Sequence, residues 1–168
     1  FLVLETTSHA LDQYRVFGIS FEIGVLTNIT HEHLDYHKTY DNYVKTKARL
    51  LLQSRIAIVN RDDSSYRIIS KLIRSASSGQ ETQKFITYGI KNGADITLEK
   101  FPFKTNLIGE FNKYNVLAAI SACKELGISL GAIRKGIESF VPPLGREDIV
   151  YKKDSTVMID FAHTPNAF

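Results

Sequence analysis

The chain has 168 residues, 43% of them hydrophobic, which is enough for one domain with a sizeable core. Its 21 basic and 18 acidic residues leave a net charge of +3, spread along the sequence, which gives no reason to expect nucleic acid binding. The single cysteine, Cys123, excludes an intrachain disulfide. The sequence has no signal peptide and no apolar run of about 18 residues, so we expect a cytoplasmic protein without membrane insertion.

The first expected strand is Phe1–Leu4, a continuous apolar run that is typical of a buried strand in a parallel sheet. Because Phe1 already stands inside this run, we expect further chain before it. The run ends in the polar segment 5–9, and the next expected strand, Phe21–Thr27, ends in the histidine-rich segment 31–37. Ligands of open α/β sheets bind beyond the carboxyl ends of strands, so we expect function at these two strand ends.

The rest of the chain alternates helical and strand patterns, as a βαβ fold requires. We expect helices over Thr39–Leu52, Phe111–Leu126 and Leu130–Phe140. We also expect a helix with the apolar stripe Tyr66, Ile69 and Ile73, whose start is capped by Asp62 or Asp63. We expect strands over Arg55–Asn60, Lys84–Gly89, Ala94–Glu99 and Thr156–Phe161, the second and third of them joined by a turn at residues 92–93. The predicted fold is α/β, a mostly parallel sheet with helices on both faces.

Three histidines, His31, His33 and His37, stand close together with Glu32 and Asp35 between them. This spacing differs from the His-Glu-x-x-His pattern of a zinc helix, and the chain has no cysteine pair. One histidine with carboxylates suits a hard, hydrated ion such as Mg²⁺ better. A solvated loop whose histidines cap helices explains the same spacing equally well.

Two more residues in this part of the chain have both a functional and an ordinary explanation. A carboxylate at a strand end, such as Glu5, is expected to be paired, bound to a metal or exposed at the sheet edge. When Glu5 is considered without its neighbours, capping or pairing is the better explanation. Lys47, taken alone, is typical of a surface lysine.

Candidate ligand contacts in the second half are Asn112, Asn115, Arg146 and Asp160. Helix capping explains one of the two asparagines more readily than both. The arginine and the aspartate suit phosphate or ribose contacts, although either alone is typical of a surface charge. Neither Gly-x-x-x-x-Gly-Lys-Ser/Thr nor Gly-x-Gly-x-x-Gly occurs, so the phosphate loop of a nucleotide enzyme is not within these 168 residues.

Several segments resemble motifs of the Mur ligase family in its MurE type. Residues 5–16 (ETTSHALDQYRV) resemble E-V-S-S-H-x-L-x-x-x-R-V, residues 27–37 (TNITHEHLDYH) resemble T-N-L-x-x-D-H-L-D-Y-H, and Tyr43-x-x-x-Lys47 resembles Y-x-x-x-K. Farther on, residues 109–115 (GEFNKYN), Gly145-Arg146 and residues 160–165 (DFAHTP) resemble G-R-F-N-x-x-N, G-R and D-Y-A-H-T-P. Order and spacing fit the family over nearly the whole chain.

The resemblance implies a P-loop NTPase-like central, ATP-binding domain over residues 1–160, lacking its phosphate loop, with residues 161–168 beginning a linker. It also implies an ATP-dependent ligase. ATP phosphorylates the terminal carboxylate of a UDP-N-acetylmuramyl dipeptide, and the amino group of a diamino acid then displaces phosphate. We expect a monomer, and we expect this fragment alone to be inactive.

The family motifs imply a role for ten residues of this sequence. Glu5 and His33 would hold Mg²⁺, and Lys47 would be carbamoylated, giving a further carboxylate near the metal. The residues implied in binding the UDP-N-acetylmuramyl dipeptide are Thr7, Gln13 and Arg15. Those implied in binding ATP are Asn112, Asn115, Arg146 and Asp160.

The sequence departs from the family pattern in a few places. Glu32 and Glu110 stand where the family has Asp and Arg, Asn166 replaces an Asp, and residues 96–107 form a short stretch. Two alternatives stay open: a non-catalytic binding or scaffold protein with the Mur ligase fold, and another ATP-dependent amide ligase of the cyanophycin or folyl-polyglutamate synthetase kind.

Overall fold

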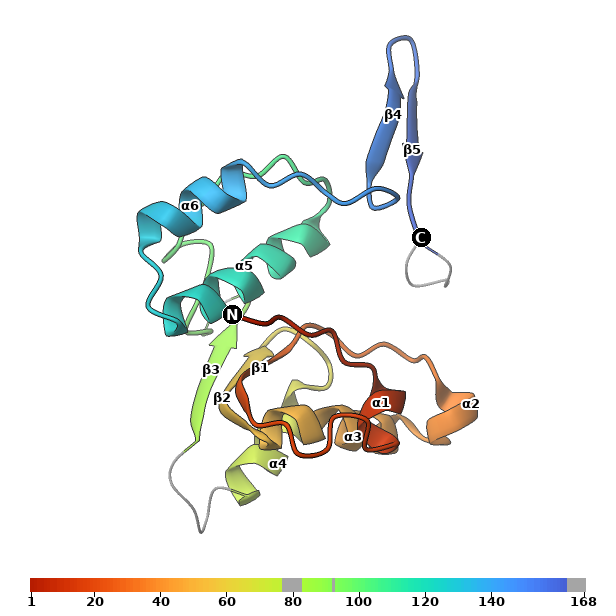
Figure 1. The fold of residues 1–168 in the computed structure, drawn as a ribbon, viewed down its shortest axis with the longest axis vertical. Coiled ribbons are helices and arrows are strands. Elements are labelled where there is room, and N and C mark those ends of the chain that lie inside the picture. Colours follow the sequence, from red (N-terminus) through yellow and green to blue (C-terminus); the bar gives the residue numbers. More distant parts are fainter. Residues whose placement is uncertain (77–82, 92, 163–168) are drawn as a thin grey trace.

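The computed structural model describes residues 1–76, 83–91 and 93–162. Its centre is a parallel sheet of three strands, β1 (Phe21–Leu26), β2 (Ser54–Asn60) and β3 (Lys84–Tyr88), in the order β1-β2-β3 (Figure 1). In the middle strand, Ile56 pairs with Ile23 on one side and with Lys84 on the other. The predicted parallel α/β sheet is therefore confirmed.

Helices cover both faces of this sheet, because successive side chains of a strand point to opposite faces. Ile56 and Ile58 of β2 pack in one hydrophobic cluster with α5 (Glu110–Glu125) and α6 (Leu130–Glu138). Ala57 and Val59 pack in a second cluster with α3 (Tyr40–Leu52) and α4 (Tyr66–Ala76). Figure 1 shows the two helix pairs on either side of the sheet.

Local capping fixes where these helices begin. The Thr39 side chain accepts a hydrogen bond from the Asn42 N–H at the start of α3, and the Ser129 side chain accepts one from the Ala132 N–H at the start of α6. Asp63 accepts from the Ser65 N–H just before α4. Such caps satisfy N–H groups that have no partner inside the helix.

The expectation of a buried strand over Phe1–Leu4 is wrong. Phe1, Leu2 and Val3 are more than nine-tenths exposed, and this segment pairs with no strand in the part of the chain that the structure describes. A buried parallel strand needs hydrogen-bonded neighbours and cover on both faces, and the described residues supply neither here. The first helix, α1 (Ser8–Asp12), follows directly.

The prediction of a strand over Ala94–Glu99 is also wrong. Ile96 forms only an isolated parallel bridge with Tyr88, and residue 92 of the expected turn lies outside the described residues. The Asp95 carboxylate accepts hydrogen bonds from the Thr87 N–H at 2.8 Å and from its hydroxyl at 2.7 Å. The backbone N–H groups of Asp95 and Ile96 both donate to the Thr87 carbonyl, so this segment stays beside β3 without forming a regular strand ladder.

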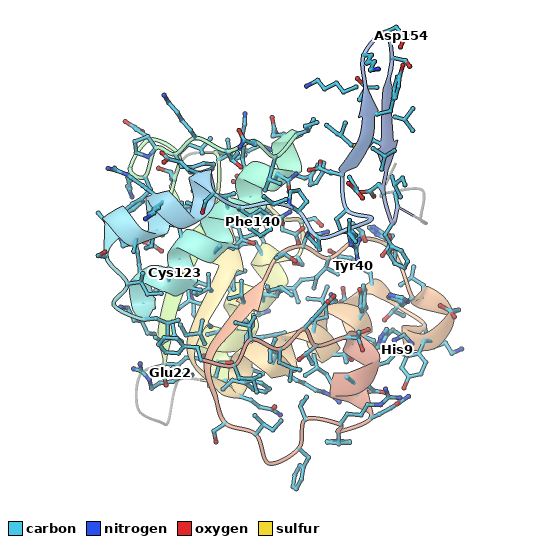
Figure 2. The ribbon with its side chains drawn as sticks, turned by 45° about the horizontal axis from the view of Figure 1, so that its top comes forward. His9, Glu22, Tyr40, Cys123, Phe140 and Asp154 are labelled. Carbon is cyan, nitrogen blue, oxygen red and sulfur yellow. The ribbon has the colours of Figure 1, made fainter. Side chains whose placement is uncertain are left out.

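The last strand exists but is not buried. Strands β4 (Asp148–Lys152) and β5 (Thr156–Ile159) form an antiparallel hairpin, and every residue of β5 is exposed. Figure 2 shows Asp154 at the tip of this hairpin, which projects away from the three-stranded sheet. Residues 163–168 lie outside the described residues, so the domain boundary at residue 160 stays a prediction.

Candidate functional site

Asp62, just beyond the carboxyl end of β2, ties three elements together. One of its oxygens accepts hydrogen bonds from the backbone N–H groups of Ile90 at 2.8 Å and Lys91 at 2.9 Å, and from the Tyr114 hydroxyl at 3.0 Å. Burial and this hydroxyl bond raise the pKa of Tyr114 to about 12, so the phenol stays a donor at neutral pH. Asp62 thus holds the start of α5 at the carboxyl edge of the sheet.

The neighbouring residue Asp63 connects the same edge to the end of β1. Its carboxylate accepts a hydrogen bond from the Ile29 N–H at 3.3 Å. The buried Tyr88 hydroxyl donates to the carbonyl oxygens of Leu26 at 3.1 Å and Thr27 at 3.3 Å, and burial raises its pKa. The three strand ends are therefore fixed relative to one another.

A cavity of about 1180 Å³ opens at this carboxyl edge. Its polar wall comes from the ends of β1 and β2 and from the first turn of α5. Its apolar wall comes from α5 and α6 and includes Cys123 and Phe140, which are labelled in Figure 2. The four residues predicted to bind ATP all line it: Asn112, Asn115, Arg146 and Asp160. The structure therefore brings these four side chains to one site, although 48 positions separate the first from the last.

Neither asparagine caps α5, whose N-cap is Gly109. The Asn112 amide is buried and donates to the Ile108 carbonyl at 2.7 Å and to the Glu147 carboxylate at 2.8 Å. The Asn115 amide donates to the Asn112 side-chain oxygen at 3.1 Å. Both amides thus face the cavity and the loop before β4.

Glu147, which no sequence motif singled out, completes this group. Its backbone is left-handed, with φ 47°, and its N–H donates to the Asp160 carboxylate at 2.8 Å. Hydrogen bonds from the backbone N–H groups of Glu147 and Ala162 lower the pKa of Asp160, and the guanidinium of Arg146 lies 4.8 Å from the Phe161 ring centre. One glutamate therefore joins α5 to the base of the hairpin.

A second group of predicted residues gathers around Tyr43 of α3. The Lys47 amine lies 5.5 Å from the centre of the Tyr43 ring, and the His33 ring lies 5.8 Å from it. Burial lowers the pKa of Lys47, opposed by the charges of Glu32, Asp63 and Glu5. Lys47 is therefore not the freely solvated surface lysine that its residue type alone suggests, and Glu32 also lines the cavity.

The residues around Lys47 fit a hydrated magnesium ion. Three carboxylates lie within electrostatic range of the amine, and the buried hydroxyl oxygen of Thr6, next to Glu5, has no hydrogen-bond partner among the described residues. Within the same residues no three His, Cys, Asp or Glu side chains are close enough to hold a metal by themselves. Mg²⁺ suits such a place, because one or two protein ligands suffice when water and phosphate supply the others.

The residues predicted to bind the dipeptide substrate lie around α1, outside the cavity. Thr7 caps this helix by accepting from the Ala10 N–H at 3.1 Å, and Gln13 ends it. Arg15 is exposed, and Tyr14 before it has a left-handed backbone, with φ 55°. These positions do not test the substrate contacts implied for the three residues, so their role stays a prediction.

Burial of Lys47 predicts a pH-dependent effect on stability. Its lowered pKa means that the folded chain disfavours the charged amine, a cost that is fully present below the folded pKa and vanishes as the pH rises to the ordinary value of about 10.4. In buffer freed of CO₂ and bicarbonate, where the amine is unmodified, we expect Lys47→Met to raise the melting temperature of the full-length protein at neutral pH, with a gain that shrinks towards pH 10. Lys45→Met, on an exposed position of the same helix, is the control, and an equal gain in both variants would contradict the burial of Lys47.

The sequence was compared with known families and solved structures. The model of the Mur ligase middle domain matches residues 1–123. The chain belongs to the Mur ligase family.

None of its described helices is long and apolar enough to cross a membrane.

Relatives of this Mur ligase domain carry the name UDP-N-acetylmuramoyl-L-alanyl-D-glutamate–2,6-diaminopimelate ligase. Those of Geobacter metallireducens and Aquifex aeolicus are 38% and 36% identical over 99% of this chain, which spans 36% of the length of each. A solved structure of a ligase with this name matches at 30% identity and a TM-score of 0.78, covering 98% of this chain and 37% of that one. The solved structure of MurF from Acinetobacter baumannii shows the shared fold. It is 21% identical, has a TM-score of 0.72, and covers 87% of this chain and 35% of its own.

The region that matches this chain is longer in the Geobacter relative. The alignment with the Geobacter relative runs over 186 positions and this chain has 168 residues, so at least 18 aligned positions have no counterpart here. Among the described residues between β3 and α5, 89–91 and 93–109, no strand is present. This Mur ligase domain is therefore shorter than its relative over the matched region.

Proposed function

We propose that this chain forms part of the active site of an ATP-dependent amide ligase that adds a diamino acid to a UDP-N-acetylmuramyl dipeptide. The proposal is supported by the names of the relatives and, above all, by the cavity that gathers all four residues predicted to bind ATP. In the proposed reaction the substrate carboxylate attacks the γ-phosphorus of ATP and ADP leaves. The amino group then attacks the acyl carbon, and phosphate leaves with the bonding electrons while the amine loses a proton.

The cavity residues supply complementary groups for a nucleotide. The amides of Asn112 and Asn115 can exchange hydrogen bonds with adenine, and the ionised Asp160 can accept from ribose hydroxyls. Arg146 carries a cation that suits phosphate oxygens. Each of these roles rests on the family motif together with the position of the residue on the cavity wall.

The group around Tyr43 is proposed to handle the transferred phosphoryl group. Glu5 and His33 would hold Mg²⁺, which neutralises charge that builds up on phosphate oxygens. Lys47 would carry a carbamate, since its lowered pKa increases the fraction of neutral amine that reacts with CO₂. Thr7, Gln13 and Arg15 are proposed to bind the dipeptide substrate, with Arg15 supplying a cation for its acidic groups.

The full-length protein provides the test. We expect ADP release that requires both the UDP-N-acetylmuramyl dipeptide and a diamino acid, with diaminopimelate and lysine compared as acceptors. ADP release with a folate and glutamate in their place would favour the folyl-polyglutamate alternative, for which the solved Lactobacillus casei enzyme, at 15% identity, shows only a shared fold. No ADP release with any acceptor would favour the scaffold alternative. The cytoplasmic location and monomeric state stay predictions.

A further inference from the structure

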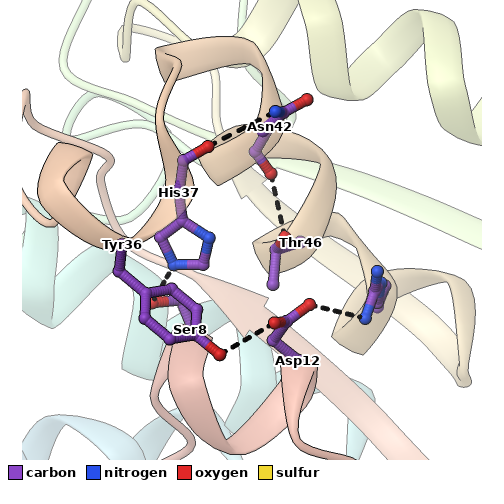
Figure 3. A network of polar contacts seen from close by, with 7 residues as sticks. Ser8, Asp12, Tyr36, His37, Asn42 and Thr46 are labelled. Carbon is purple, nitrogen blue, oxygen red and sulfur yellow. Dashed lines mark hydrogen bonds and ion pairs between the residues drawn. The ribbon is translucent and has the colours of Figure 1, made fainter.

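His37 is a buried histidine that no step of the proposed reaction uses. It ends the single-turn helix α2 (Leu34–His37) and is only 6% exposed. One ring nitrogen lies 3.0 Å from the Ser8 hydroxyl, and Figure 3 shows the ring directed at Ser8. The ring also stacks on Tyr43, with ring centres 5.0 Å apart and planes inclined by 21°.

The contacts of His37 reach each of the three segments that carry the proposed reactive residues. Ser8 stands three positions after Glu5, and Tyr43 stands one helical turn before Lys47, under its amine. The N–H of His37 donates to the carbonyl of His33 at 2.9 Å. One buried ring and its backbone therefore connect the segments of Glu5, His33 and Lys47.

The backbone of α2 shows why such an anchor is needed. The two residues that flank this helix, His33 with φ 56° and Lys38 with φ 66°, are left-handed although neither is glycine. Side chains with a Cβ rarely adopt this conformation, and it persists only when surrounding contacts enforce it. The His37 carbonyl accepts from the Asn42 amide at 3.3 Å, and the Tyr36 hydroxyl donates to Asp12 at 2.9 Å, so α2 is held from α1 and from α3 (Figure 3).

We propose that His37 is a positioning residue, whose buried ring fixes Glu5, His33 and Lys47 relative to one another. The inference rests on the proposed function of these three residues. His37 touches no proposed reactant: it acts through the hydroxyl of Ser8 and the ring of Tyr43. A core histidine that only stabilised the fold would lower stability when replaced but would leave metal binding and the chemical step unchanged.

The test uses Ser8→Ala, His37→Phe and His37→Gln in the full-length protein. Ser8→Ala and His37→Phe remove the hydrogen bond between His37 and Ser8. The phenylalanine keeps a ring against Tyr43, whereas the glutamine of His37→Gln keeps a polar group near Ser8. We expect Ser8→Ala and His37→Phe to weaken Mn²⁺ binding, followed by electron paramagnetic resonance, and to lower kcat, each by about 10- to 100-fold, as loss of a residue that orients metal ligands usually does. The KM for ATP is expected to stay within about twofold, and His37→Gln to recover part of both losses.

Ile86→Val is the matched control, because it removes one methyl group from the core on the opposite face of the sheet. For each variant, the losses of Mn²⁺ affinity and of kcat are compared with its loss of melting temperature. If the Mn²⁺ affinity and the kcat of Ser8→Ala and of His37→Phe fall no further, for a given loss of melting temperature, than those of Ile86→Val, His37 is a core residue only and the inference is overturned. Absence of ADP release by the wild-type full-length protein with these substrates would instead overturn the proposed function itself, so the two failures are distinguishable; Ser8→Ala keeps the test valid should His37→Phe not fold.

Discussion

Lys47→Ala in the full-length protein is expected to lower the rate of ligation on the order of 100- to 1000-fold, as is usual when a group that stabilises transition-state charge is lost. The lysine is partly buried and its pKa is lowered by that burial, which favours the neutral amine that forms a carbamate. The amine lies 5.5 Å from the centre of the Tyr43 ring, and the alanine variant removes the amine while it keeps that ring. ADP release at saturating substrates measures the effect.

Rescue experiments separate a carbamate from a simple cation. Bicarbonate is expected to give no recovery in Lys47→Ala, because alanine has no amine to react with CO₂. A short carboxylic acid such as formate or acetate is expected to recover part of the rate by filling the vacated space with a carboxylate. Lys45→Ala, exposed on the same helix, is expected to keep the wild-type rate. Wild-type turnover of Lys47→Ala would show that Lys47 takes no part in the reaction and would remove α3 from the active site.

Elements with a strong local pattern were predictable from the sequence. The apolar run that became β2 and the helical spacing that became α3 were placed to within one residue at either end, because burial of one or both faces dictates the residue types there. Of the two polar strand ends predicted to carry function, the one after β1 lies at the edge on which the cavity opens, whereas residues 5–9 do not line the cavity. The general place of the site therefore follows from local patterns.

Elements that depend on distant partners were not predictable. Phe1–Leu4 has the composition of a buried strand, but a strand is made by its neighbours, and none of the described strands pairs with it. The expected strand over Ala94–Glu99 is replaced by hydrogen bonds from Thr87 to Asp95, which a hydrophobic pattern does not reveal. Strand β4 was missed because its exposed residues show no contrast between a buried and a solvated face.

The contacts within the site were the least predictable part. Asn112 and Glu147 are 35 positions apart in the sequence, and the left-handed backbone of Glu147 has no glycine to announce it. Either Asp62 or Asp63 was expected to cap α4, and Asp63 does so, whereas the Asp62 carboxylate bonds to the loop after β3 and to Tyr114. Side-chain contacts between segments arise only once the sheet brings its strand ends together.

Asn112→Asp in the full-length protein is expected to raise the KM for ATP about 10- to 100-fold, the effect of losing one hydrogen bond to a charged group, while kcat changes less. The Asn112 amide lies 2.8 Å from the Glu147 carboxylate, so the substitution brings two negative charges into contact on the cavity wall. Lys113→Gln is the control, because it changes the net charge by the same amount at the adjacent exposed position.

The double variant Asn112→Asp/Glu147→Gln tests whether the contact between α5 and the base of the hairpin carries this effect. It restores a donor and an acceptor to the pair with their roles exchanged, so that the glutamine amide donates to the new carboxylate and the repulsion is removed. Part of the loss in KM is expected to be recovered, and the coupling between the two substitutions measures the contribution of the contact. Recovery should be incomplete, because the Asn112 amide also donates to the Ile108 carbonyl at 2.7 Å and is proposed to meet adenine. A KM for Asn112→Asp no higher than that of Lys113→Gln would place the nucleotide away from α5, and the proposed role of this cavity wall would fail with it.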